Sequence, residues 1–129
     1  MKIIKTDKAP QAIGPYSQAI ISDRLVFTSG QIGIDPDSGY LDSESFDLEA
    51  MQVFKNLENL LIDSGSSLDR IIKLNIFILD MSDFEKLNAI MVRLFKGKKL
   101  PSRSTVEVSR LPKDARIEID AIAEVGDDI

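Results

Sequence analysis

A long strand pattern between two one-sided helix patterns constrains the fold of this 129-residue chain most strongly. The strand is expected at Ile71–Leu79, where apolar residues recur at every second position. On either side, apolar residues recur at every third or fourth position, which is typical of a helix with one apolar side. Such helices need a surface to cover. The pattern therefore predicts an α+β fold, with two helices packed on one face of a mixed β-sheet.

The two helices have recognisable ends. The first is expected to end at Gly65, the usual place for a glycine after a helix. The second is expected to start with Ser82 and Glu85 at capping-box spacing and to end at Gly97. The predicted apolar stripes are Leu48, Met51, Phe54, Leu57 and Leu61 in the first helix and Phe84, Leu87, Met91, Leu94 and Phe95 in the second.

The remaining strand patterns complete the sheet. They lie at Ala19–Ser22, Leu25–Gln31, Arg103–Val108 and Arg116–Val125. The first two are expected to form a hairpin, and residues 35–39 have the composition of a turn. Residues 126–129 are expected to fray. No repeat, low-complexity tract or linker divides the chain, so residues 1–129 are interpreted as a single domain.

The second face of the predicted sheet has no helix of this chain to cover it. The residues expected on that face are Ile71, Lys73, Asn75, Phe77, Arg103 and Glu118. A face that mixes apolar and charged side chains in this way is typical of a subunit interface with a buried polar site. We therefore expect the protein to form an oligomer.

The absence of cysteine and histidine restricts the possible chemistry. Without cysteine there is no disulfide, no thiolate nucleophile and no sulfur ligand for a metal. Without histidine the usual general base and the commonest zinc ligand are missing, which excludes a zinc-dependent nucleobase deaminase. No metal and no cofactor are therefore expected.

Charge and hydropathy indicate the partners. The net charge of −5 disfavours nucleic acid, and the basic run Lys96–Lys99 is interpreted as a solvated helix end. No run of eighteen apolar residues suggests a membrane span. Because residues 1–8 are too charged for a signal peptide, a cytoplasmic location is expected.

Arg103 and Glu118 are the candidates for chemistry. Arg103 follows the stiff residue Pro101 at the start of a strand, and a guanidinium can grip a planar carboxylate through two hydrogen bonds. Glu118 is the carboxylate that would orient or activate a water. Taken singly these residues are more often surface ion-pair partners, Tyr16 could be a packed loop aromatic, and residues 28–30 could form a β-bulge. The residues alone indicate a small-carboxylate site with an acid/base group.

Five motifs add to this interpretation. They are AIGPYSQA at 12–19, TSGQ at 28–31, PSRS at 101–104, VEVSRLPKD at 106–114 and IEIDAIA at 117–123. In order and spacing they resemble the RidA/YjgF family of reactive-intermediate deaminases, and the resemblance runs from about Ala9 to Val125. It implies a chorismate-mutase-like α+β fold, assembled as a homotrimer with three clefts between subunits.

The resemblance also implies roles for individual residues. Arg103 would bind the substrate carboxylate and Glu118 would position the attacking water, while Tyr16, Ser29, Gly30 and Asn88 would line the cleft. Thr105 stands where the family commonly has cysteine, and Ser102 stands where it usually has another small residue. We expect Thr105 to preserve hydrolysis and to alter the polarity of the cleft.

The implied function is that of a 2-iminobutanoate/2-iminopropanoate deaminase. Such an enzyme hydrolyses the reactive enamines and imines released by amino-acid dehydratases to 2-oxo acids and ammonia. One alternative is a trimer that binds a 2-oxo acid in a regulatory role without turnover. A ribonuclease or translation inhibitor is a second alternative, which the acidic charge and the absent histidine disfavour. The preferred substrate side chain and the dehydratase that supplies the imine stay open.

Overall fold

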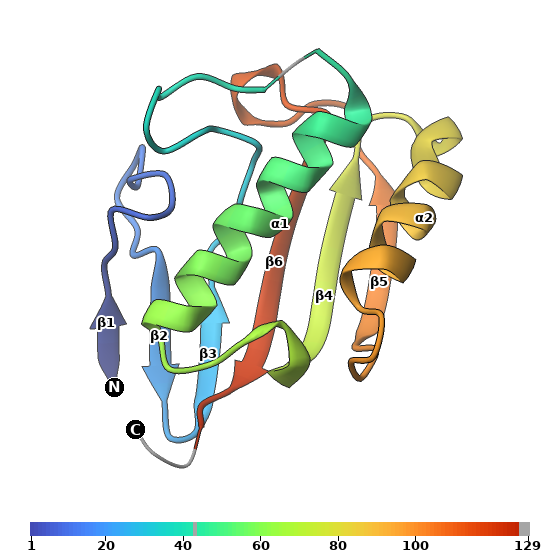
Figure 1. Cartoon of the computed structure of the whole chain (residues 1–129). Coiled ribbons are helices and arrows are strands. Elements are labelled where there is room, and N and C mark those ends of the chain that lie inside the picture. Colours follow the sequence, from blue (N-terminus) through green and yellow to red (C-terminus); the bar gives the residue numbers. More distant parts are fainter. Residues whose placement is uncertain (43, 127–129) are drawn as a thin grey trace.

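Two helices lie on the same side of one mixed sheet in the computed structural model, which describes residues 1–42 and 44–126 (Figure 1). The helices are α1 (Phe46–Asp63) and α2 (Phe84–Leu94). The strands are β1 (Lys2–Ile4), β2 (Ala19–Ser22), β3 (Leu25–Thr28), β4 (Ile71–Ile78), β5 (Ser102–Glu107) and β6 (Ile117–Glu124). Their order in the sheet is β1-β2-β3-β6-β4-β5, with only the β4–β5 pair parallel among these strands. The predicted α+β architecture is confirmed.

The predicted hairpin and turn are both present. β2 and β3 pair around Asp23, which has a φ of 53°. Asp35 accepts a hydrogen bond from the amide of Gly39 (2.8 Å). β3 ends at Thr28, three residues before the expected end, and pairing with β6 resumes only at Gln31. Residues 29 and 30 therefore interrupt the strand and leave the ladder.

Both ends of the described chain are more ordered than predicted from the sequence. The short strand β1 was not predicted, because two of its three residues are exposed and give no alternation. At the other end, Gly126 is buried and its amide donates to the carbonyl oxygen of Gly65 (2.8 Å). The rest of the expected frayed end, residues 127–129, lies outside the described residues. No helix in the described ranges is long and apolar enough to cross a membrane.

The predicted stripe of α1 is wrong in its first turns. Leu48 and Met51 are exposed, at 46% and 37% of their surface. The buried apolar residues of α1 are Phe46, Ala50, Val53, Phe54, Leu57, Leu60 and Leu61. Both sets have helical spacing, so periodicity alone could not choose between them. The side that is buried also carries two polar residues, Glu49 and Asn56, whose groups find backbone partners there.

The helix α2 begins differently from the prediction, although its stripe is largely correct. Asp80 accepts a hydrogen bond from the amide of Ser82 (2.9 Å) and starts a short 3-10 turn (Met81–Asp83), so Ser82 and Glu85 form no capping box. Leu87, Met91 and Phe95 are buried as expected. The rings of Phe54 and Phe95 pack edge to face, with centroids 6.4 Å apart, and join the two helices.

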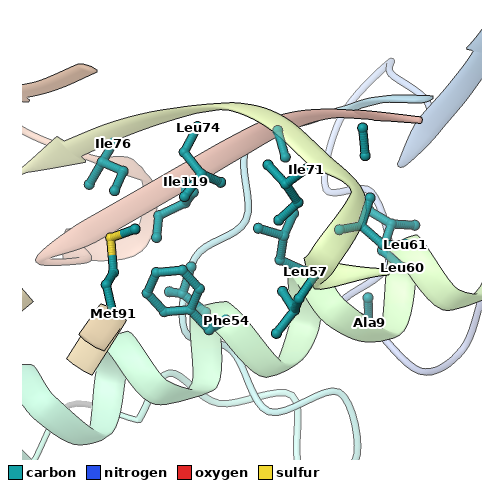
Figure 2. Packing of buried hydrophobic residues seen from close by; sticks show 14 of the residues in the cluster. Ala9, Phe54, Leu57, Leu60, Leu61, Ile71, Leu74, Ile76, Met91 and Ile119 are labelled. Carbon is teal, nitrogen blue, oxygen red and sulfur yellow. The ribbon is translucent and has the colours of Figure 1, made fainter. Parts of the chain in front are cut away.

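A bulge at the start of β4 reverses two of the predicted faces. The pairing with β6 shifts between Ile71 and Lys73, so one extra residue enters β4. Ile71 therefore points toward α1 and is buried, while Ile72 is exposed (Figure 2). Beyond the bulge Leu74, Ile76 and Ile78 are buried as predicted. The core lies between this face of the sheet and the two helices (Figure 2).

Asn56 ties α1 to the loop that follows the interrupted strand. Its side chain is fully buried and donates to the carbonyl oxygens of Ile32 (3.1 Å) and Ile34 (2.8 Å). The side-chain oxygen Oδ1 of Asn56 accepts a hydrogen bond from the side-chain amide of Gln52 (2.8 Å). A buried amide in an apolar helix face is tolerated only when its groups are paired in this way. Asn56 therefore fixes residues 32–34 against α1.

We expect Asn56→Ala to lower the free energy of unfolding by about 2 to 4 kcal/mol, because two buried carbonyl oxygens lose their donor. Asn59→Ala is the matched control, since Asn59 makes one exposed bond to Lys8 (2.9 Å), and it should cost less than about 1 kcal/mol. Urea unfolding at one fixed protein concentration measures both. Equal losses in the two variants would contradict the role given to Asn56.

Candidate active site

Arg103 lies on the face of the sheet that the helices cover, which corrects its predicted placement. It is aligned with the buried residue Leu74 across the parallel β4–β5 pair. Aligned residues share a face, so Arg103 points toward α2 and away from Lys73, Asn75 and Phe77. Alternation within each strand is visible in the sequence, but the register between strands is not, and a shift of one residue exchanges the two faces.

Three residues of α2 hold the guanidinium of Arg103. Its Nη1 donates to Oδ1 of Asn88 (2.7 Å) and lies 3.4 Å from the sulfur of Met91. Its central carbon lies 5.2 Å from the centroid of the Phe84 ring, within the range of a cation–π contact. Phe84, Asn88 and Met91 are spaced by four and three positions, so they share one side of the helix. We call these three residues and Arg103 the Arg103 cluster.

The Arg103 cluster leaves most of the guanidinium donors available. Within residues 1–42 and 44–126, Nε and Nη2 of Arg103 have no hydrogen-bond partner and no carboxylate pairs with the side chain. A half-buried guanidinium ordinarily finds an anionic partner. The cluster therefore presents an oriented cation that is ready for an anion.

Thr105 lies on the same face of β5 as Arg103, two residues further along. It is aligned with the buried residue Ile76, and its hydroxyl oxygen is buried with no hydrogen-bond partner in the part of the chain that the structure describes. A buried hydroxyl without a partner is costly. Thr105 thus places a buried polar group on the same face of β5 as the cation.

Glu118 lies on the uncovered face, as predicted. It is aligned with Phe77 across the antiparallel β4–β6 pair. Its carboxyl packs directly on Gly30, where a Cβ atom would come within 2.5 Å of Oε2 and 2.7 Å of Cδ. Any other residue at position 30 would displace this carboxyl. The interruption of β3 at residues 29 and 30 is what brings this glycine against Glu118.

The surroundings of Glu118 favour its protonated form. Burial raises the pKa of Glu118, and the negative charge of Asp120 on the same face raises it further. Asp120 is held in place by a hydrogen bond from the side-chain amide of Asn75 (2.8 Å). A carboxyl whose pKa is raised in this way suits proton transfer nearer neutrality.

A hollow of about 320 Å³ opens beside Glu118. We call it the Glu118 hollow, and it is lined by Ile13, Tyr16, Ser29, Gly30, Pro112 and Glu118. The Tyr16 hydroxyl accepts from the amide of Ile13 (3.2 Å), and the Ser29 hydroxyl donates to the carbonyl oxygen of Ser17 (2.5 Å). The amide of Gly30 donates to no group in the described residues. The hollow thus offers a carboxyl and a free amide in a partly apolar wall.

The candidate residues therefore form two separate groups in one chain. Tyr16, Ser29 and Gly30 join Glu118 at the hollow, whereas Asn88 and Thr105 join Arg103 on the other face of the sheet. The structure does not bring Arg103 and Glu118 together. Four residues that contribute to these groups were not predicted as site residues, namely Phe84, Met91, Ile13 and Pro112. The spacing of Phe84 and Met91 from Asn88 in the sequence is that of one helix side, but both residues were predicted to belong to the apolar core.

No group of three or more Asp or Glu side chains in the described ranges is arranged to hold a metal ion. The polar groups at hand are therefore a guanidinium, a carboxyl, hydroxyls and backbone amides. These can bind a carboxylate, position a water and transfer a proton.

Comparison with known proteins gives the family. A family model described as Endoribonuclease L-PSP matches residues 6–125. A 2-iminobutanoate/2-iminopropanoate deaminase of Mus musculus is 44% identical over 125 residues, which are 97% of this chain and 92% of that protein. The crystal structure of a protein of the conserved Rid family from Yersinia pestis has a TM-score of 0.94 at 45% identity and covers 96% of this chain and 98% of its own.

A second solved structure, E. coli TdcF with bound serine, has a TM-score of 0.94 at 39% identity and covers 98% of this chain and 100% of its own. Identity of this size over nearly the whole of each chain is accompanied by the same fold. This chain therefore belongs to the Endoribonuclease L-PSP family, the RidA/YjgF family that its motifs resemble.

Proposed function

We propose that the protein is a metal-independent deaminase that hydrolyses 2-iminobutanoate and 2-iminopropanoate to the corresponding 2-oxo acids and ammonia. The identity to relatives that carry this name supports the reaction, at 44% for the mouse protein and 43% for the human protein. The cytoplasmic location and the lack of a nucleic-acid partner stay predictions. The imine would come from amino-acid dehydratases, as the family resemblance implies.

The observation that carries the proposal is that Arg103 is oriented but has no anionic partner among the residues that the structure describes. Its guanidinium is oriented by Asn88 and Phe84, and within the described ranges it has no anionic partner. A carboxylate of the substrate would supply that partner through Nε and Nη2, in the two-point geometry that a guanidinium offers. The buried hydroxyl of Thr105 on the same face would contact the rest of the substrate.

Glu118 supplies the proton transfers in this scheme. The ionised carboxyl takes a proton from water as the water oxygen attacks the carbon of the protonated imine, which leaves a hydroxyl and an amine on that carbon. The carboxyl passes this proton to the amine nitrogen and then takes the hydroxyl proton as the carbon–nitrogen bond breaks, so that a 2-oxo acid and ammonia leave. Transfer of that last proton to the departing ammonia returns the carboxyl to its ionised form. Because an imine carbon is already electrophilic, positioning and one carboxyl are sufficient. The free amide of Gly30 would hold an oxygen of the reacting molecule.

A complete site requires two copies of the chain in this proposal. Arg103 and Glu118 lie on opposite faces of the sheet in one subunit, so the Arg103 cluster of one subunit would face the Glu118 hollow of its neighbour. The homotrimer implied by the family resemblance would contain three such clefts. The apolar residues Phe27, Ile72 and Val106 are exposed, at 41% to 45% of their surface, on the uncovered face, which supports an oligomer.

Two other functions make different demands on these residues. A binding protein without turnover would need Arg103 but not Glu118. A ribonuclease, which the family description names, finds little support in the acidic chain with a net charge of −5 and no histidine. Relatives that are 43% to 45% identical over 125 residues are named deaminases, which favours hydrolysis over simple binding.

We expect the protein to accelerate formation of 2-oxobutanoate when threonine dehydratase generates the imine. Arg103→Ala should lower kcat/KM by about 100- to 1,000-fold, because a charged partner of the substrate is lost. Glu118→Ala should lower kcat by about 100-fold or more while binding of 2-oxobutanoate persists. Arg93→Ala, which changes an exposed arginine of α2, serves as the control and should behave as the parent protein. No acceleration by the folded protein would refute the enzyme, and turnover retained in Glu118→Ala would refute the role of that carboxyl.

The pH dependence gives a second test. Glu118 acts in its ionised form, so kcat/KM should be present above its raised pKa and should decline as the pH falls through it. Asp120→Asn removes the neighbouring charge but keeps the acceptor for Asn75, which lowers the pKa of Glu118 and should move the acid limb to lower pH. Asp47→Asn on exposed α1 surface is the control. An acid limb that stays in place or moves upward in Asp120→Asn would contradict the assignment.

A further inference from the structure

Glu49 is a buried carboxyl that neither the core nor the proposed reaction explains. It lies in the first turn of α1 and is 0% exposed. Burial raises the pKa of Glu49, while hydrogen bonds from the amides of Arg116 and Ile117 and the charge of Arg116 oppose the rise. Because a well-packed apolar residue is often as stable at such a position, stability alone is a weak reason for a carboxyl there.

The contacts of Glu49 lie at the beginning of β6. Its Oε2 accepts from the amide of Arg116 (2.5 Å), two residues before Glu118. Its Oε1 lies 3.9 Å from Nη1 of Arg116 and has no hydrogen-bond partner in the described residues. Arg116 and Glu118 are two residues apart, which is one repeat of a β-strand. A hydrogen bond that fixes the backbone at Arg116 therefore also fixes the position of the Glu118 backbone, from which the carboxyl extends.

The turn that Glu49 anchors is strained. Lys113 and Asp114 have φ values of 59° and 56°, a left-handed conformation that costs free energy in residues other than glycine. Pro112, at the start of this turn, lines the Glu118 hollow. Strained backbone persists only where its surroundings hold it, and Glu49 holds the chain directly after this turn.

Glu49 also contacts the segment that follows Gly30. Gly33 packs on it so closely that a Cβ atom there would lie 2.8 Å from Cγ and from the carbonyl oxygen of Glu49. The segment of Gly33 continues from Gly30, on which the Glu118 carboxyl rests. The buried Glu49 side chain therefore contacts two backbone segments, the start of β6 and the loop at Gly33. Glu118 belongs to the first segment, and Gly30 lies just before the second.

We infer that Glu49 is a positioning residue, which fixes the start of β6 and the loop at Gly33 so that the Glu118 carboxyl is held against Gly30 in the geometry required for hydrolysis. This inference rests on the proposed function for its kinetic consequence. Glu49 acts through Glu118 and touches no substrate. Its loss should therefore affect turnover and the environment of Glu118 more than it affects substrate binding.

The test compares Glu49→Met with Leu61→Ala, a matched core variant at the far end of α1. In Glu49→Met, kcat should fall by about 10- to 100-fold with KM within about twofold, because misplacing a catalytic group acts on the chemical step. A carboxyl-carbon NMR titration should show the midpoint of Glu118 moving toward that of an ordinary glutamate, because the side chain leaves its packed position. Glu49→Gln keeps an acceptor oxygen and should restore most of both properties.

Leu61→Ala should lower stability while it leaves kcat and the Glu118 titration unchanged. The same kcat and the same Glu118 midpoint in Glu49→Met as in Leu61→Ala would overturn the inference. If Glu49→Met does not fold, Glu49→Asp replaces it, since the shorter side chain withdraws the carboxyl from Arg116. The titration needs no substrate, so an unmoved Glu118 midpoint overturns the inference even if the parent protein fails to hydrolyse imines. That failure would refute the proposed function separately.

Discussion

The two-residue alternation of the strands decides how this chain can build a site. β4 and β6 are neighbouring inner strands of the sheet, and their register places Glu118 on the uncovered face beside Phe77. The parallel pairing of β4 with β5 places Arg103 on the covered face beside Leu74. A cation and a carboxyl on opposite faces cannot reach the same small molecule within one chain. The division into two half-sites follows directly, and with it the need for a second subunit in the proposed reaction.

The helix α1 connects the core to the half-site at Glu118. Its buried side is apolar except for Glu49 and Asn56, and each of these polar groups binds the backbone of a segment that has left the regular ladder. Asn56 holds the loop at residues 32–34, and Glu49 holds the strained turn before β6. The same face of the helix thus packs the core and fixes the irregular segments that surround the carboxyl.

Periodicity predicted the layers of the fold, the hairpin, the long strand and both helices. It failed at the α1 stripe and at Ile71 and Ile72, because two helical registers fitted equally well and a bulge leaves no mark in the sequence. Arg103 and Glu118 were proposed as site residues from their chemistry, and the other five candidates were proposed through the family resemblance. Their roles stay predictions, and Arg103 was placed on the wrong face. Strand register depends on contacts distant in the sequence, which local patterns do not contain.

The central claim is that one active site combines Arg103 of one subunit with Glu118 of another, and mixing two inactive variants tests it most directly. Arg103→Ala and Glu118→Ala subunits would be unfolded together and reassembled, with subunit exchange verified by mass spectrometry. If the proposed trimer reassembles at random from equal amounts of the two variants, about a quarter of all clefts would join two intact halves, so about a quarter of the parent activity should return. A mixture that has exchanged subunits yet stays as inactive as the two separate variants would contradict the account.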